Sequence, residues 1–403
     1  MDVKQLILLN DLAKKDGSAT PHKRDIFNKL LEHKDKTLAG LHGPRGAGKT
    51  VLLKQLLANT PDGFYVSLDT LERTTNVFEL VLSLHQDYRF QTFFLDEIHF
   101  IEDINKYLKI LFDNLNIRIF FTSSIALKLI ESAHDLSRRV KIFSIDYFSF
   151  SEFLRFNKYP TPPALSWNDI LSKNFRSAHS ESLPYLQAYL RGGNIPISLE
   201  VKDVLESLQR NLEKIINSDI PKLKSLKVDE LPIIMNAFRF IARAPGGDLN
   251  PNTIAKNLKI TRYKALQYLE LLEAGFILKL VLPHGTEVTR EPKILCKVPY
   301  RLLECEYDDC IGGLREDFAV HCMLQAGLKI KYLKSKRGAK TPDFLVTDSD
   351  GTKSIVEIGG ANKSYSQFKG ISEKHTKMVF GDHADLSKNT LPLGLLGFLS
   401  ERE

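Results

Sequence analysis

The sequence has no apolar run close to the ~20 residues that a membrane-spanning helix needs. Its first ten residues hold a short apolar patch, Leu6 to Leu9, but they lack the basic flank and the long apolar region of a signal peptide. Both features argue against a membrane partner. We therefore expect a cytoplasmic protein.

Cysteine is scarce, with four residues that all fall in the last third of the chain and form no C-x₂-C pair. Structural zinc sites usually contain such pairs. Reduced and buried thiols are the simpler interpretation, although His321 beside Cys322 adds a second type of zinc ligand.

The excess of positive charge is also small, at 56 basic against 49 acidic residues, a formal net charge of +7 and a pI near 9.0. This balance is compatible with a nucleic-acid partner but does not indicate one by itself. With 43% hydrophobic and 26% charged residues, the composition is that of a folded protein. A chain of 403 residues exceeds one compact core, so we expect about two to four domains.

The most informative stretch satisfies the pattern G-x-x-x-x-G-K-[ST] between an apolar run, 38–41, and a helical pattern, 51–57. Its glycines let backbone N–H groups turn toward phosphate oxygens, and the following helix adds its positive dipole end. We expect Lys49 to contact the β- and γ-phosphates of ATP and Thr50 to bind Mg²⁺. The predicted nucleotide-binding residues are Gly43, Pro44, Arg45, Gly46, Ala47, Gly48, Lys49 and Thr50.

A second motif is the apolar run from Thr92 to Leu95, which is followed by Asp96 and Glu97. Asp96 is predicted to bind the Mg²⁺ shell, and Glu97 to orient and polarise the water that attacks the γ-phosphate. Two carboxylates at a strand end also occur as surface caps. Their position after the phosphate loop and one intervening strand favours the catalytic interpretation.

Thr122 and Ser123 close a fourth predicted strand, 117–121. Ligands of open α/β sheets bind at the carboxyl ends of the strands, where these hydroxyls could sense the γ-phosphate or position water. Alternatively, Ser123 or Ser124 caps a helix predicted for 126–130. A fifth strand is predicted at 140–145, and the alternation of strands and helices indicates a parallel sheet.

Five motifs together resemble an AAA-superfamily ATPase of the bacterial and archaeal kind: Gly43–Thr50, Asp96–Glu97, Thr122–Ser124, Ser137–Val140 and Phe148–Leu154. The run Leu190–Pro196 is a loose match to the Leu-x-Gly-Gly-x-Pro signature of that family. The resemblance implies an α/β fold in which an ASCE/AAA-type P-loop domain is followed by a winged helix-turn-helix and an α/β domain resembling restriction endonucleases. The predicted domains are an ATPase domain with a helical extension, 1–195, a winged helix-turn-helix domain, 196–288, and a nuclease-like domain, 289–403.

The same resemblance matches Arg139 to an arginine that precedes the fifth strand, a candidate transition-state finger in its own site or in that of a neighbour. The family has glycine where this chain has Arg138, so either arginine could serve. A solvated basic pair is the alternative. A finger supplied by a neighbour would require a homo-oligomer.

Three helices and a strand pair, typical of a winged helix, are predicted between residues 231 and 289. The helices cover 233–242, a segment opened by Asn250 and Pro251, and a segment from Thr261 to about 274. The strands are predicted at 276–281 and 286–289.

A basic cluster lies where the third of these helices would meet DNA, with Tyr263 and Gln267 available for base contacts. Winged helices in such ATPases also pack as lids or bind proteins, so DNA and a protein partner both remain open. The residues of the cluster are Lys256, Lys259, Arg262 and Lys264.

The last third resembles the PD-(D/E)XK nuclease fold, with Asp343 in a Pro-Asp pair and Glu357 one strand later. In an active member these two acids hold Mg²⁺, and a lysine two residues after the glutamate polarises water. That position is Gly359 here, unless Lys363 substitutes from the following helix. We therefore expect a binding domain without cleavage activity.

Three functions follow from these patterns. The leading hypothesis is an ATP-hydrolysing switch or motor that acts on DNA or on a protein partner. The second is a slow nucleotide-sensing regulator, and the third is a metal-dependent nuclease.

Overall fold

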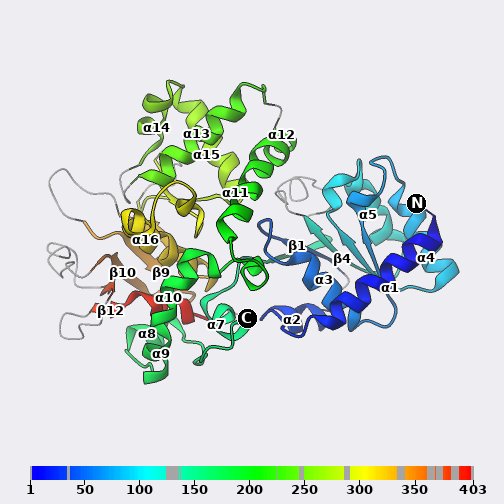
Figure 1. Cartoon of the computed structure of the whole chain (residues 1–403), viewed down its shortest axis with the longest axis horizontal. Helices are drawn as coiled ribbons and strands as arrows, with labels where there is room; N and C mark the ends of the chain where they lie inside the picture. The colour runs from blue at the N-terminus through cyan, green and yellow to red at the C-terminus, as the bar shows by residue number, and fades with distance from the viewer. Residues whose placement is uncertain are drawn as a thin grey trace. The chain divides into compact units, whose positions relative to one another are not determined.

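The computed structural model of the chain (Figure 1) describes residues 2–33, 37–123, 136, 138–224, 226–244, 249–285, 291–333, 341–360, 368, 375–382 and 390–400. Its contacts divide the chain into two compact units, Met1–Tyr147 and Phe148–Glu403.

The first unit contains a parallel sheet of five strands in the order β2-β3-β4-β1-β5. This arrangement confirms the predicted parallel sheet of an α/β fold. Strand β4 lies between β1, which leads into the phosphate loop, and β3, which ends at Asp96. The strands are β1 (Leu38–His42), β2 (Gly63–Ser67), β3 (Thr92–Asp96), β4 (Arg118–Ser123) and β5 (Val140–Ser144).

Helices pack on this sheet because successive strand residues point to opposite faces. One face packs on two amphipathic helices through Leu84 and Leu108, among others. The helices of the unit are α1 (Val3–Ala19), α2 (Phe27–Leu31), α3 (Lys49–Ala58), α4 (Val77–Tyr88) and α5 (Ile104–Asn114), with short 3₁₀ turns η1 (Leu68–Thr70) and η2 (Ile98–Phe100).

Helix α1 fixes one edge of the sheet. The Asn10 side-chain oxygen accepts a hydrogen bond from the Tyr65 N–H at 2.8 Å, so this N–H of the edge strand β2 has a partner. A Cβ atom at Gly17 would lie 1.9 Å from the Lys54 carbonyl oxygen. Only glycine therefore permits the close approach of α1 to α3.

The second unit begins with a helical segment and contains a second sheet. Its helices are α7 (Phe150–Phe156), α8 (Trp167–Leu171), α9 (Ser177–Ser182), α10 (Leu186–Ala188), α11 (Val204–Lys214), α12 (Ile220–Leu223), α13 (Glu230–Arg243), α14 (Pro251–Leu258), α15 (Arg262–Ala274) and α16 (Tyr307–Gln325). Short 3₁₀ or π turns are η3 (Leu183–Tyr185), η4 (Tyr189–Gly193), η5 (Pro196–Leu199), η6 (Ile215–Asp219), η7 (Tyr300–Leu303) and η10 (Leu393–Phe398).

The three helices predicted between 231 and 274 are confirmed as α13, α14 and α15. Asn250 accepts hydrogen bonds from the first turn of α14, Pro251 occupies its first position, and Thr261 accepts from the Lys264 N–H at 3.2 Å. These caps are local features, which is why the sequence reveals them.

The strand pairing differs from the expectation. Strand β6 (Leu278–Val281) pairs antiparallel with β7 (Lys293–Cys296), which the sequence reasoning placed in the third domain. The predicted second strand, 286–289, lies outside the described residues.

The second sheet has five strands in the order β12-β11-β10-β9-β8. Strands β8, β9 and β10 are antiparallel neighbours, whereas β10, β11 and β12 run parallel. The helix that the nuclease resemblance implies after β10, from which Lys363 would act, falls almost wholly outside the described residues. The strands are β8 (Lys329–Tyr332), β9 (Phe344–Thr347), β10 (Lys353–Ile358), β11 (Thr376–Gly381) and β12 (Thr390–Pro392).

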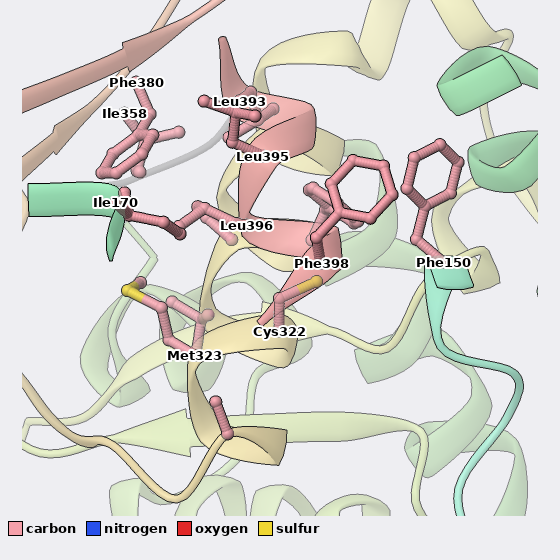
Figure 2. Close-up of a cluster of buried hydrophobic side chains, with 14 of the residues drawn as sticks. Phe150, Ile170, Cys322, Met323, Ile358, Phe380, Leu393, Leu395, Leu396 and Phe398 are labelled. Atoms are coloured by element: carbon pink, nitrogen blue, oxygen red, sulfur yellow. The ribbon is translucent and has the colours of Figure 1, made fainter. Parts of the chain in front are cut away.

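One core in the second unit joins segments that are distant in sequence (Figure 2). The rings of Phe150 and Phe398 lie 5.3 Å apart, and Met323 of α16 and Phe380 of β11 belong to the same cluster. Residues 148–190 therefore contribute to a core that also contains the second sheet. The division into three domains at 195 and 288 stays a prediction.

A candidate nucleotide site at the carboxyl edge of the first sheet

The phosphate loop connects β1 to α3, as its motif requires, and three of its glycines are needed for its shape. Gly46 and Gly48 have φ values of 77° and 83°, in the left-handed region that disfavours other residues. A Cβ atom at Gly43 would lie 1.7 Å from the Ile145 carbonyl oxygen. At these three positions the backbone conformation and the close contact therefore favour glycine over other residues.

Arg24 supports the loop from outside the motif. Its guanidinium donates to the Ala47 carbonyl at 2.9 Å and to the Asp146 carbonyl at 3.0 Å. The Tyr147 hydroxyl donates to the Arg45 carbonyl at 3.2 Å. Sequence reasoning missed both supports, because nothing near Arg24 in the sequence marks it as a partner of the loop.

Lys49 is buried, and its ammonium donates to the carbonyl oxygens of Gly43 at 2.7 Å and Pro44 at 2.9 Å. These bonds hold the positive charge over the loop, where phosphates of a nucleotide would bind. Thr50 follows in the first turn of α3 and is half-buried. Both residues thus lie where the motif predicts them.

Asp96 is buried at the end of β3, and both of its carboxylate oxygens accept hydrogen bonds. The Tyr65 hydroxyl of β2 donates to Oδ2 at 2.9 Å, and the Thr122 hydroxyl of β4 donates to Oδ1. Burial and the Asp96 charge raise the pKa of Tyr65, so its hydroxyl stays protonated as the donor. Two neighbouring strands therefore fix the orientation of this carboxylate.

Thr122 also accepts the Glu97 N–H at 2.9 Å. A single hydroxyl thus bridges both acids. Ser123, the next residue, is buried beside His42 in the β1–β4 register. The helix that Ser123 might alternatively cap, at 126–130, lies outside the described residues.

Glu97 has a left-handed backbone, with φ of 52°, and its Oε2 lies 3.1 Å from His99 Nδ1. Burial raises the pKa of Glu97, but His99, Lys49 and Arg45 outweigh it and lower the pKa to about 2. Such a weakly basic carboxylate is better suited to orienting and polarising water than to removing its proton. The sequence gives no signal for His99.

His42 ends β1 immediately before the loop. Burial and the Lys49 charge lower its pKa to about 4, although a hydrogen bond with the Ser123 backbone opposes this shift. The imidazole is therefore neutral at pH 7 and adds no charge beside Lys49.

Arg139 lies at the amino ends of the strands, opposite to the end that carries the phosphate loop. It precedes Val140, which is paired with Leu38 at the start of β1, and its guanidinium makes a bidentate pair with Asp113 at 2.8 and 3.1 Å. Strand β1 has five residues that each rise about 3.3 Å, so Arg139 is roughly 17 Å from the loop of its own chain. This separation argues against a finger in the same chain, and the role of Arg139 as a finger, in its own site or in that of a neighbour, stays a prediction. Arg138 is exposed.

The donors at the loop fit a nucleotide with Mg²⁺. A hydroxyl at Thr50 and a carboxylate at Asp96 are the hard oxygen donors that Mg²⁺ prefers, and it usually keeps several waters. Because both Asp96 oxygens already accept hydrogen bonds, a contact through such a water suits this carboxylate. Loop N–H groups and Lys49 suit phosphate oxygens.

The basic cluster on α14 and α15 is only partly as predicted. Lys256 and Lys259 are exposed, and Tyr263 is 72% exposed. Lys264, however, makes an ion pair with the buried Glu230 of α13. Gln267 is only 7% exposed, so the prediction that it reads bases is wrong, because this face of α15 packs inward.

Asp343 and Glu357 lie side by side, as the nuclease resemblance implies. Phe344 pairs with Val356 in the antiparallel register of β9 and β10, which places the preceding Asp343 opposite Glu357. Lys363 lies outside the described residues. Among the residues that the structure describes, no group of three or more His, Cys, Asp or Glu side chains is arranged to hold a metal ion.

The four cysteines form no disulfide. Burial raises the pKa of Cys296 to about 12, which keeps this group a neutral thiol. Within the described ranges, none of the helices combines the length and the apolar character needed to cross a membrane.

Comparison with known proteins supports the assignment of a P-loop domain to the first part of the chain. Residues 35–154 match the family model of an AAA domain, and residues 185–296 match a domain of unknown function. The chain thus contains an AAA-type, ATPase-like P-loop domain. It is 28% identical over 416 residues to an uncharacterized protein of Methanocaldococcus jannaschii, covering 93% of this chain and 87% of that protein.

Two solved structures show weaker similarity. A Walker-type ATPase of Pyrococcus abyssi aligns at 15% identity with a TM-score of 0.44, over 70% of this chain and 95% of that one. The Hsp104–ADP complex of S. cerevisiae aligns at 16% identity with a TM-score of 0.33, over 64% of this chain and 40% of that one.

Proposed function

We propose that this protein binds ATP with Mg²⁺ at the phosphate loop and hydrolyses it, and that it acts as a switch or motor on DNA or a protein partner. The observation that carries the proposal is the convergence of Lys49, Asp96, Glu97 and Thr122 at one edge of a parallel sheet. Phosphoryl transfer depends mainly on positioning and on charge stabilisation, which these residues supply.

Each residue has a distinct role in this proposal. Lys49 binds the β- and γ-phosphates, and Thr50 and Asp96 hold the metal and its waters. Mg²⁺, when bound, neutralises charge on the phosphate oxygens. Glu97 orients the attacking water, and Thr122 keeps Glu97 and Asp96 in register through its two hydrogen bonds.

Two substitutions test the proposal. Lys49→Ala removes charge-assisted hydrogen bonds of about 2–3 kcal/mol, so nucleotide affinity should fall roughly 100-fold. Lys54→Ala on the same helix, where Lys54 pairs with Asp16, is the matched control. Unchanged nucleotide affinity in Lys49→Ala would falsify the proposal.

Glu97→Gln keeps the shape of the side chain but removes its charge. We expect nucleotide binding to remain, while steady-state phosphate release falls at least about 100-fold. Glu102→Gln, an exposed glutamate nearby, serves as the control. Equal turnover in Glu97→Gln and wild type would remove Glu97 from the mechanism.

A slow nucleotide-sensing regulator is the second candidate, and the position of Arg139 favours it for an isolated chain. Arg139 cannot reach its own loop, and an arginine finger accounts for about 10³–10⁵ in rate where one operates. Negligible phosphate release at every concentration of protein and partner would support this second function.

A further inference from the structure

A buried lysine occupies the acidic site of the second sheet. Lys293 of β7 places its ammonium 2.8 Å from Glu316 of α16 and 3.5 Å from Asp343 before β9. The three side chains are only 7%, 12% and 15% exposed, respectively. Solvent therefore screens this group of charges weakly.

The surroundings of Lys293 hold it in this position. Its ammonium lies 4.6 Å from the centroid of the Phe344 ring, a favourable cation–π distance. Asp343 receives the Ile358 N–H on its other oxygen at 2.8 Å, which fixes that carboxylate. Glu357 is fully buried in the neighbouring register position.

The charge state of Lys293 agrees with this geometry. Burial by itself lowers the pKa of Lys293, but the nearby charges of Glu316 and Asp343 outweigh burial and raise it. The site therefore contains an ammonium ion at neutral pH. Its single positive charge already contacts two of the carboxylates.

These contacts do not fit a divalent metal ion. Mg²⁺ and Ca²⁺ bind carboxylate oxygens at about 2.0–2.6 Å. An ion bound to Asp343 Oδ1 would share that oxygen with the Lys293 ammonium 3.5 Å away, a like charge that also contacts Glu316 Oε2 at 2.8 Å. The resemblance to a metal-dependent nuclease and the observed geometry thus disagree.

We propose that the Lys293 ammonium is the built-in cation of this acidic site and takes the place that a divalent metal would occupy. The second sheet then binds no divalent cation at Asp343 and has no metal-activated water. On this proposal the acidic site of the second sheet is a structural element that needs no metal. This inference does not depend on ATP hydrolysis by the first unit.

The test uses the full-length chain without nucleotide and follows Mn²⁺ binding by electron paramagnetic resonance. Wild type should bind no Mn²⁺ that is sensitive to Asp343→Asn. Lys293→Met should gain one such ion per chain, and Lys293→Met/Asp343→Asn should lose it. Lys279→Met, which removes an exposed strand lysine paired with Glu273, should behave as wild type. Any Mn²⁺ at the phosphate loop is common to all variants and insensitive to Asp343→Asn.

A second variant covers the possibility that Lys293→Met does not fold. Lys293→Met/Glu316→Gln removes the cation and one carboxylate together, so the net charge of the site is preserved. Thermal unfolding of this variant should shift upward with Mn²⁺, and that shift should vanish with Asp343→Asn. Absence of a Mn²⁺ gain in both Lys293 variants overturns the proposal.

Nicking of supercoiled plasmid gives an independent outcome. Wild type with Mn²⁺ should leave the plasmid intact. Nicking by wild type that disappears in both Asp343→Ala and Glu357→Ala would establish a metal-dependent nuclease and overturn the proposal.

Discussion

Asp96 illustrates how much of the candidate site depends on single side chains. Its two oxygens accept hydrogen bonds from Tyr65 and Thr122, which come from the strands on either side of β3. A carboxylate held in this way loses little conformational freedom when a metal and its waters bind. Pre-organisation at this residue thus comes from two neutral donors, of which Tyr65 lies outside the motifs seen in the sequence.

Tyr65→Phe should test this pre-organisation. The substitution removes one buried hydrogen bond of about 1 kcal/mol, so we expect kcat/KM for ATP to fall roughly 5- to 10-fold, with the fold preserved. Steady-state phosphate release at saturating Mg²⁺ is the measurement. Tyr88→Phe, a change on the exposed end of α4, controls for loss of a hydroxyl. Equal activity in both variants would show that Thr122 alone is sufficient.

At the level of elements, helix α15 has two sides with different contacts, although its basic residues form one cluster in the sequence. Lys264 and Tyr268 bind Glu230 of α13, so one side of α15 holds the helices together. The exposed side, with Lys256 and Lys259 of the preceding segment nearby, is available to a partner. The candidate DNA surface therefore has fewer available basic residues than the predicted cluster.

The exposed part of that surface gives a prediction for DNA. Lys256→Glu/Lys259→Glu should weaken duplex binding at least about tenfold for any sequence, because phosphate contacts carry no base specificity. The slope of log affinity against log salt concentration should fall by about two. Fluorescence anisotropy over a salt series measures both. Lys4→Glu/Lys15→Glu on α1 provides the same charge change elsewhere.

If wild type binds no DNA, or if both double variants lose affinity equally, the exposed lysines of this surface do not serve DNA binding. A protein partner or a lid contact would then be the better explanation.

The lowered pKa of Glu230 lets us predict how the stability of this helical region depends on pH. The hydrogen bond from Lys264 is the main cause that lowers its pKa from 4.5 to about 2. The folded state thus binds fewer protons than the unfolded state between these values. The stabilisation is complete above about pH 4.5 and is lost as the pH falls toward 2.

Glu230→Gln should therefore lower the free energy of unfolding at pH 7 by about 1–3 kcal/mol. Between pH 4.5 and pH 3, the variant should lose less stability than wild type. Urea unfolding at the three pH values measures the difference. Parallel pH curves for the two proteins would contradict the assignment.

At the scale of the whole molecule, the position of Arg139 concerns assembly. Arg139 precedes β5 at the end of the sheet opposite to the phosphate loop and pairs with Asp113 of α5. An arginine there can stabilise developing charge only in the site of a second copy. Turnover should then depend on protein concentration, because the complete site requires two chains.

Complementation provides the test. Arg139→Ala and Glu97→Gln should each be nearly inactive, with Arg139→Ala losing about 10³-fold or more. Their mixture should recover part of the activity, since a Glu97 site in one chain meets an Arg139 in the next. Arg138→Ala is the matched control and should retain activity. Loss in Arg138→Ala instead would assign the finger to Arg138.

Light scattering with and without a non-hydrolysable ATP analogue gives the corresponding mass. We expect a larger species with the analogue. A monomer under both conditions would exclude a finger supplied in trans.

The sequence by itself determined what depends on contiguous residues. The turn of the phosphate loop, the positions of the five strands of the first unit along the chain, and the caps of α14 and α15 are set by residue patterns within a few positions, so their residue types reveal them.

Only the tertiary structure decided which distant side chains meet. Arg24 behind the loop, Tyr65 on Asp96, and Lys293 between Glu316 and Asp343 are brought together by packing across strands and helices. Such contacts depend on sheet order and register, which no local pattern encodes. For the same reason, Arg139 could be recognised in the sequence, but its distance from the phosphate loop could not.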